Sequence, residues 1–195
     1  GRLAAVICIE DPLRAEAPEV IADLKKLGIS KIVMMTGDGE RTARAIAARV
    51  GVDEYYAEVL PEDKAGFVEA EKKKGRKVVM VGDGINDSPA LSAADVGIAI
   101  SEGAEIAREI ADITISEDAL HQLITLKEIS NALLKRVQFN YRFVIGFNLG
   151  LILLGVGGIL TPAASALLHN TSTLAISLRS MTNLLKDPEE ACQKS

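Results

Sequence analysis

The feature that most constrains this sequence is a long run without charge near its C-terminal end. From Phe143 to Leu178 no Asp, Glu, Lys or Arg occurs, although charged residues make up 25% of the chain. A buried helix of a soluble protein rarely needs such a run, whereas a membrane span needs about 20 apolar residues. Thr161-Pro162, preceded by three glycines, interrupts the run. We therefore predict two short transmembrane helices, from about Arg142 to Leu160 and from about Ala163 to Met181.

Basic residues flank one end of each predicted span. The first span is preceded by Lys135 and Arg136 and begins at Arg142. Near the end of the second span lies Arg179, and Lys186 follows it. By the positive-inside rule these flanks lie on the cytoplasmic side. We expect a multi-pass protein of the cell membrane whose remaining part is cytoplasmic. The alternative is a hydrophobic dimerisation hairpin in a soluble protein.

Before the hairpin, predicted strands and helices alternate, which is typical of a parallel α/β sheet. We expect an α/β part over residues 1–117, a connecting helix over 118–141, the transmembrane hairpin over 142–182 and a polar tail over 183–195. The predicted strands are Leu3–Ile9, Lys31–Met35, Tyr55–Val59, Lys77–Val81, Val96–Ile100 and Asp112–Ile115. The predicted helices of the α/β part are Ala15–Leu27, Glu40–Val50, Glu62–Lys74, Ser88–Ala94 and Glu102–Glu109.

Charge and cysteine content exclude two classes of function. With 22 basic and 27 acidic residues the net charge is −5, so no basic face is expected to neutralise nucleic-acid phosphates. The two cysteines, Cys8 and Cys192, lie at opposite ends without a CxxC partner. A thiolate metal site or a disulfide framework is therefore not expected.

Three groups of polar residues follow predicted strands or open a helix. Thr36-Gly37-Asp38-Gly39 follows one strand, Asp83-Gly84-Ile85-Asn86-Asp87 follows another, and Lys64 lies in the first turn of the helix that "LPEDK" opens. In open α/β sheets, ligands gather beyond the carboxyl ends of the strands. A hydroxyl and an ammonium group suit phosphate oxygens, and carboxylates suit Mg²⁺.

These groups predict that Thr36, Lys64 and Asp83 meet around a magnesium-bound phosphate. Gly37, Gly82 and Gly84 would let backbone N–H groups approach the anion. Each group also has a plainer interpretation. TGDG is equally a turn with a helix cap, and Lys64 alone is a common kind of surface charge. The segment GDGIND is more specific, because two carboxylates so close together repel unless a cation is present.

The spaced set of motifs resembles the haloacid-dehalogenase phosphotransferase core, and more closely the phosphorylation domain of P-type ATPases. The matching stretches cover most of the chain. They are "DPLR" (Asp11–Arg14), "MTGDGERTARAIAARVGV" (Met35–Val52), "LPEDKAGFV" (Leu60–Val68) and "VGDGINDSPALSAADVGIAI" (Val81–Ile100). The single hairpin after this domain resembles the heavy-metal branch of the family. The resemblance implies a partial, Rossmann-like haloacid-dehalogenase fold followed by a membrane hairpin.

The resemblance also implies roles for individual residues, with ATP and Mg²⁺ as cofactors. Asp83 is similar to an aspartate that binds Mg²⁺, and Asn86 and Asp87 to residues that hold its orientation and the phosphate end. Thr36 and Lys64 are similar to the phosphate ligands, and Asp38 lies in the loop beside them.

One departure from the family pattern is important. The family nucleophile is the Asp of a DKTGT stretch, which these 195 residues do not contain. Asp11 stands in DPLR, without the Lys-Thr that follows the nucleophile. The sequence also contains no TGE loop and no Cys-Pro-Cys site. We expect the chain to need the remainder of the pump, including its nucleophile and its nucleotide-binding and actuator domains, and to be inactive alone.

Polar residues inside the predicted spans are candidates for contact with the transported ion, because burying them in lipid is costly. Copper exporters of this branch show N-x6-Y-N in the first span and M-x-x-S-S in the second. The equivalents here are Asn140-x6-Phe147-Asn148 and His169-x-x-Ser172-Thr173. Imidazole in place of a thioether favours a divalent ion such as Zn²⁺, Co²⁺ or Mn²⁺. We predict His169, Asn148 and Ser172 as ligands; the alternative is that they bond only across the helices.

The leading hypothesis is therefore part of an ATP-driven heavy-metal cation transporter. Alternatives are a non-enzymatic regulatory or remnant module that docks on a full-length pump, and another P-type branch such as a potassium pump. A soluble phosphatase of the same superfamily is opposed by the charge-free run.

Overall fold

The computed structural model describes residues 13–83, 86–100, 109–115 and 120–184. Its contacts divide the chain into two compact units, Gly1–Ile124 and Thr125–Ser195. The predicted strand Leu3–Ile9, most of the predicted helix Glu102–Glu109, and the residues Asp11 and Gly84 lie outside the described residues.

The first unit is an α/β structure in which strands and helices alternate along the chain. All described strand pairs are parallel: β1 pairs with β2, and β3, β4 and β5 form a second sheet in that order. This confirms the predicted parallel α/β class. The strands are β1 (Val33–Met35), β2 (Glu54–Tyr56), β3 (Val79–Gly82), β4 (Val96–Ile100) and β5 (Ile113–Ile115). The helices are α1 (Ala17–Lys26), α2 (Glu40–Val50), α3 (Pro61–Lys73) and α4 (Ser88–Ala93).

Most predicted boundaries agree with the structure to within about two residues, but the predicted strand Tyr55–Val59 was wrong at its C-terminal end. β2 stops at Tyr56. Beyond it the chain turns, with Glu58 in the left-handed region at φ 54° and the amide of Val59 donating to the carbonyl of Thr36 at 3.0 Å. This turn directs the chain into α3, so that β2 cannot continue.

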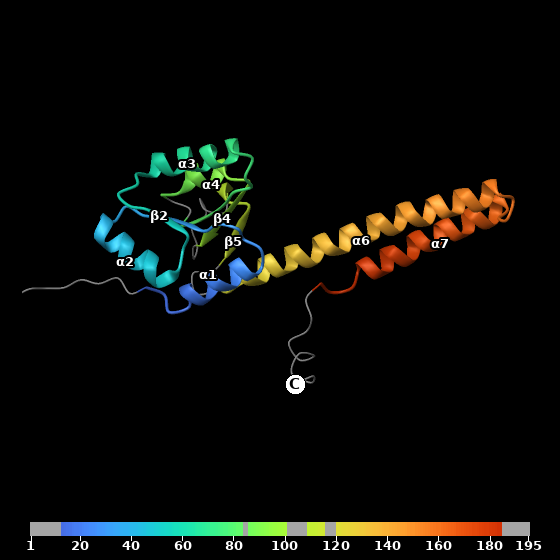
Figure 1. Ribbon diagram of the computed structural model, residues 1–195, viewed down its shortest axis with the longest axis horizontal. Coiled ribbons are helices and arrows are strands. Elements are labelled where there is room, and N and C mark those ends of the chain that lie inside the picture. Colours follow the sequence, from blue (N-terminus) through green and yellow to red (C-terminus); the bar gives the residue numbers. More distant parts are fainter. Residues whose placement is uncertain (1–12, 84–85, 101–108, 116–119, 185–195) are drawn as a thin grey trace, which may run out of the picture. The chain divides into compact units, whose positions relative to one another are not determined.

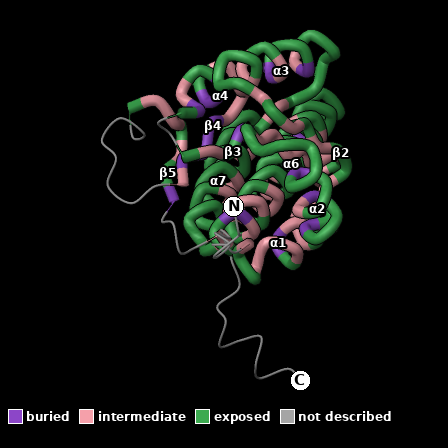
Figure 2. The backbone as a smooth tube through the Cα atoms, turned by 90° about the vertical axis from the view of Figure 1, so that its left-hand side faces the viewer, coloured by how far each residue is buried: buried purple, intermediate pink, exposed green. Residues whose placement is uncertain are grey.

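The core of the second sheet lies under α3 and α4. Val68 of α3, Met80 of β3, and Ala90 and Leu91 of α4 form one buried cluster, and these helices lie on the same face of the sheet (Figure 1). Burying a side chain such as Leu91, which is 1% exposed, contributes about 1.5–3 kcal/mol. Figure 2 shows buried and exposed stretches alternating along α1 to α4, as expected for helices that cover a sheet with one side.

An aspartate placed directly before a strand recurs three times in this unit. Asp53 precedes β2 and accepts a hydrogen bond from the amide of Ile32 at 2.7 Å. Asp95 precedes β4 and accepts from the amide of Val78 at 2.9 Å. Asp112 precedes β5 and accepts from the amide of Gly97 at 2.8 Å. In each case the amide lies at or near the start of the neighbouring strand, so the carboxylate fixes where the two strands begin to pair.

The second unit contains two antiparallel helices, which run side by side in Figure 1. They are α6 (Gln122–Val156), whose first turn belongs to the first unit, and α7 (Pro162–Ser180). α6 ends at Val156. Two residues later Gly158 has a φ of +71°, and the amide of Ile159 donates to the carbonyl of Leu154 at 3.0 Å, a helix-ending arrangement that favours glycine. Thr161 then caps α7, accepting from the amide of Ala164 at 3.3 Å. The predicted break at Thr161-Pro162 is therefore present.

α6 is one continuous helix of 35 residues, about 52 Å long at 1.5 Å per residue. The predicted connecting helix and first span are thus parts of a single element. Among the described helices, α6 is the one that is long and apolar enough to cross a membrane, with a mean hydropathy of 1.5 over its most apolar 18-residue window. Only 6% of that window is buried by protein. For α7, which has 19 residues and carries the polar run His169–Thr173, a membrane position remains a prediction.

Candidate functional site

The loop after β1 is held by its own side chains. The Thr36 hydroxyl donates to Asp38 Oδ2 at 2.8 Å, and the backbone amide of Asp38 donates back to Thr36 Oγ1 at 3.1 Å. Gly37 and Asp38 are exposed. The threonine hydroxyl therefore stands at the carboxyl end of a parallel strand with a fixed orientation, in a position that a phosphate oxygen could reach.

Lys64 forms an ion pair with Asp87. The Lys64 Nζ lies 2.6 Å from Asp87 Oδ1, and the two side chains are only 15% and 12% exposed. Lys64 comes from the first turns of α3, and Asp87 from the residue just before α4. The sequence required a cation near the paired carboxylates, and the Lys64 ammonium is one such cation.

Gly82 makes room for Asp87 at the end of β3. A Cβ atom at this position would lie 2.5 Å from Asp87 Oδ2 and 2.7 Å from its Cβ, distances that real Cβ atoms essentially never show. A side chain on residue 82 would thus displace Asp87 from its position beside Lys64. This gives Gly82 a steric role in addition to the predicted backbone approach to an anion.

Asp83 is the exposed carboxylate of the cluster. Its two oxygens accept hydrogen bonds from Asn86, one from the backbone amide and one from the side-chain Nδ2, each at 3.1 Å. Asn86 therefore restricts the orientation of the Asp83 carboxylate; its part in binding Mg²⁺ remains a prediction. Gly84, the other predicted anion-binding glycine of this loop, lies outside the described residues.

Backbone and side-chain contacts link the Thr36 loop to the Asp83–Asp87 loop. The amide of Val59 donates to the Thr36 carbonyl at 3.0 Å, and the amide of Glu58 donates to the Asp38 carbonyl at 2.9 Å. These residues lead directly into α3, whose Lys64 reaches Asp87. The contacts bring the predicted phosphate-binding loops into one connected network. Direct convergence of Thr36, Lys64 and Asp83 on one ligand remains a prediction.

In the hairpin, the structure brings His169 and Asn148 together. His169 Nδ1 lies 2.8 Å from Asn148 Oδ1. Because an amide oxygen can only accept, Nδ1 is the donor in this contact, and Nε2 is the ring nitrogen that the contact does not use. A histidine held in this way is arranged as metal-binding histidines commonly are, with one ring nitrogen donating to an oxygen and the other available to a metal.

The other polar residues of the hairpin form mostly local hydrogen bonds. The hydroxyls of Ser172 and Thr173 both donate to the backbone carbonyl of His169, at 2.8 and 3.0 Å. They therefore lie next to His169, but their contacts are also those of helical Ser and Thr in general. Eight residues before Asn148 on the same helix, Asn140 Nδ2 donates to Ser180 Oγ at 2.9 Å. Asn140 Oδ1 is buried without a described partner.

Comparison with known proteins agrees with this geometry. A family model described as haloacid dehalogenase-like hydrolase matches residues 1–95. The chain is 42% identical, over 90% of its length, to a zinc-exporting P-type ATPase of Mycobacterium marinum, and 41% identical over the same share to a manganese-exporting P-type ATPase of Mycobacterium leprae. The crystal structure of a zinc-transporting PIB-type ATPase in the E2.Pi state superposes on 91% of the chain with a TM-score of 0.79 at 33% identity.

The chain is homologous to heavy-metal P-type ATPases. It spans about a quarter of the length of these curated relatives, namely 24% of each, and 29% of the solved zinc-transporting structure. Its first unit therefore has the haloacid-dehalogenase-like fold that the sequence motifs predicted, and its similarity to these ATPases extends through both units.

Mg²⁺, which the family resemblance implies, can be tested against the side chains present. Mg²⁺ usually keeps several waters and takes one or two protein carboxylates together with substrate phosphate. Within the described ranges, no group of three or more His, Cys, Asp or Glu side chains lies close enough to hold a metal ion. Asp83 offers one exposed, oriented carboxylate at the end of β3. This fits a magnesium ion shared with a phosphate better than one enclosed by protein.

Sequence reasoning missed a buried acid of this ATPase-like unit, Glu71. Its residue is 7% exposed, and its carboxylate pairs with Lys74, at 2.6 Å, and with Arg76. The hydrogen bond from Lys74, followed by that from Arg76, lowers the pKa of Glu71. These contacts close the turn between α3 and β3. The only signal was the pattern "EKKKGR", in which one acid precedes several bases.

Proposed function

We propose that the chain forms part of an ATP-driven heavy-metal cation transporter, contributing half of its phosphorylation domain and its last two membrane spans. The observation that supports this most is the network that joins the Thr36 loop, through the start of α3, to the Lys64–Asp87 pair and the Asp83 loop. A phosphoryl-transfer site needs several positive and hydrogen-bonding groups oriented in advance around one anion. The network holds such groups in place before any ligand binds.

In this proposal each residue of the first unit has a separate task. The Thr36 hydroxyl and the Lys64 ammonium hold phosphate oxygens, and Asp38 orients the threonine. Asp83, oriented by Asn86, ligates Mg²⁺, which supplies positive charge to the phosphate. Asp87 keeps Lys64 extended toward the site. ATP would deliver the phosphoryl group to an aspartate elsewhere in the complete pump, because no DKTGT stretch occurs in these residues.

In the hairpin, His169 would contact the transported ion through Nε2, with Asn148 orienting the ring and Ser172 as a further oxygen ligand. The support is the 2.8 Å contact between His169 and Asn148. Nitrogen and oxygen donors favour a divalent ion of borderline hardness. The relatives named as zinc and manganese exporters are consistent with such a substrate.

Titration calorimetry of the chain with Mg²⁺ tests the first part. We expect Asp83→Asn to weaken binding at least tenfold, because it removes the one charged ligand that the proposal assigns. Asp63→Asn, which changes an exposed acid in the first turn of α3, is the control and should leave binding unchanged. Equal affinity in the Asp83 variant and in the unmodified chain would remove Asp83 from the site.

The second part is tested in a complete pump that contains this segment. His169→Ala should abolish the stimulation of ATP hydrolysis by divalent metal, whereas Thr171→Ala, on the same helix, should retain it. Thr171 donates only to the backbone carbonyl of Leu167 among the described contacts. Undiminished stimulation in the His169 variant would show that the His169–Asn148 contact only joins the helices.

A further inference from the structure

The hairpin carries two adjoining hollows of different character. The larger, of about 320 Å³, is lined by Ala132, Lys135, Arg136, Phe139, Arg179 and Leu184. The smaller, of about 190 Å³, lies further along the helices and is mostly apolar. Phe139 and Arg179 line both. The two hollows therefore form one continuous groove with a cationic end and an apolar end.

The cationic end has no carboxylate to neutralise it within the hairpin. No Asp or Glu occurs between Glu128 and Asp187, so Lys135, Arg136 and Arg179 bring positive charge to a stretch of the chain that carries no carboxylate of its own. Among the described residues, Arg136 donates to neutral acceptors: the carbonyls of Ser180, Thr182 and Asn183 at 3.1, 2.6 and 3.0 Å, and the Thr182 hydroxyl at 3.2 Å. These bonds hold the charge in place without cancelling it.

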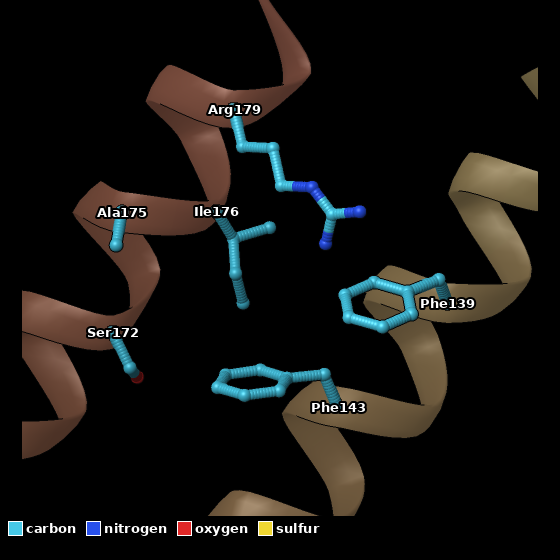
Figure 3. A pocket seen from close by; sticks show the side chains of 6 residues that line it. All are labelled: Phe139, Phe143, Ser172, Ala175, Ile176 and Arg179. Carbon is cyan, nitrogen blue, oxygen red and sulfur yellow. The ribbon is translucent and has the colours of Figure 1, made fainter.

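The apolar end is formed by aromatic and aliphatic side chains. Figure 3 shows Phe143 and Ile176 facing each other from the two helices, with the Arg179 guanidinium above Phe139. The guanidinium carbon lies 4.1 Å from the centre of the Phe139 ring, and the Phe139 and Phe143 rings are 6.3 Å apart between their centres. Phe139 thus lies between the charged and the apolar halves of the groove.

We infer that this groove binds an anionic phospholipid. The phosphate would lie among Lys135, Arg136 and Arg179, and an acyl chain would run along Phe139, Phe143 and Ile176. An amphiphile with a negative head matches both halves of the groove, whereas a free phosphate ion would use only the cationic half. Basic pockets between membrane helices on the cytoplasmic side are suited to such lipid headgroups. The inference rests on the membrane position of the hairpin in the proposed function.

Native mass spectrometry of the purified 195-residue chain in detergent, with equal amounts of phosphatidylglycerol and phosphatidylcholine, tests the inference. We expect phosphatidylglycerol to be retained preferentially. Lys135→Gln and Arg179→Gln should each lower its retention about fivefold, since one basic residue near an anionic lipid surface contributes about 1 kcal/mol. Lys135 forms no ion pair within the described residues, so its variant keeps the test valid even if Arg179→Gln unfolds the hairpin.

Arg142→Gln is the matched control. Arg142 lies on the same helix and is exposed, but it lines neither hollow, so its loss should leave the lipid preference unchanged. An equal drop for Arg142→Gln and Lys135→Gln would overturn the proposed groove. Added inorganic phosphate should not displace the lipid; displacement would show an anion site without a lipid site.

A separate measurement distinguishes this inference from the proposed function. Alkaline carbonate should leave the chain in the membrane fraction, and its release would contradict the membrane position itself. A chain that stays in the membrane but retains both lipids equally would overturn the lipid inference and leave the proposed function intact.

Discussion

The two units differ in how far their large apolar side chains are exposed. In the first unit Leu91 and Val68 are each 1% exposed, whereas in the hairpin Leu149, Ile152 and Leu153 are 55%, 62% and 64% exposed. The first unit buries its apolar residues between helices and strands, as a protein surrounded by water must. The hairpin presents them outward over most of α6 and α7. Apolar content alone therefore does not predict a core, and the membrane position proposed for the hairpin would account for the difference.

The polar groups of the two units differ in a corresponding way. In the first unit, carboxylates at strand ends bind backbone amides and lysines, as Asp95 and Asp87 do. In the hairpin, two contacts across the helices join uncharged side chains, Asn148 with His169 and Asn140 with Ser180. The charged residues Arg136 and Arg179 make their contacts across the helices near one end. Charge in the hairpin is thus restricted to basic residues at one end, since the stretch from Phe143 to Leu178 carries none.

The largest expected contrast comes from the same substitution in both units. Leu91→Ala should destabilise the first unit by about 3 kcal/mol, because it removes a fully buried side chain and leaves a cavity. Leu153→Ala should change the stability of the hairpin by less than about 0.5 kcal/mol. Urea unfolding in detergent, followed by hydrogen exchange of peptides from each unit, measures both. Comparable losses would mean that the hairpin also packs a protein core around Leu153.

A smaller loss is expected from Asp112→Ala. This change leaves the buried amide of Gly97 without its carboxylate acceptor, which costs about 2 kcal/mol. Asp112→Asn keeps an acceptor oxygen and should cost clearly less. The exchange rate of the Gly97 amide reports the difference directly. If both variants exchange at the rate of the unmodified chain, the aspartate does not fix the pairing of β4 and β5.

The third effect depends on pH. Lys74, followed by Arg76, lowers the pKa of Glu71 below its ordinary 4.5. Since the folded-state pKa is below that of the unfolded chain, the stabilisation is present above about pH 4.5 and is lost as the pH falls through the folded-state value. Glu71→Gln should therefore lower the urea midpoint at neutral pH and reduce its decline in acid. Glu69→Gln, an exposed acid on the same helix, should keep the full decline.

The smallest effect is expected between the helices of the hairpin. A double-mutant cycle with Asn140→Ala and Ser180→Ala should give a coupling energy of about 0.6 kcal/mol, the usual size of such bonds in membranes. Steric trapping in bicelles measures it. A coupling several times larger would mean that polar contacts, and not lipid-facing packing, determine the stability of the hairpin.

Regular elements were predictable from the sequence because local signals fix them. α2 and β4 have the predicted bounds. α2 is followed by Gly51 at φ 77°, which ends the helix. The apolar run Val96–Ile100 is too short for a helix and has the length of a buried strand. The α/β class followed from the alternation of such signals, and the haloacid-dehalogenase-like fold from the resemblance of the motifs.

Features that depend on distant residues were not predictable. The Lys64–Asp87 pair joins residues 23 positions apart, and only the folded chain brings them together. The early end of β2 depends on a hydrogen bond between Val59 and Thr36. The aspartates before β2, β4 and β5 are visible in the sequence as "VDEYY", "ADVGI" and "ADITI", but their shared task is recognisable only once the neighbouring strands are known.

The hydrogen bonds of Arg136 have a mechanical consequence. They tie α6 to the last carbonyl of α7, that of Ser180, and to Thr182 and Asn183, which follow the helix. For one helix to slide past the other by a single turn, about 5.4 Å, all of them would have to break together. A force that displaces α6 along its axis is therefore transmitted to α7, and we expect the two helices to shift or tilt together as a rigid body.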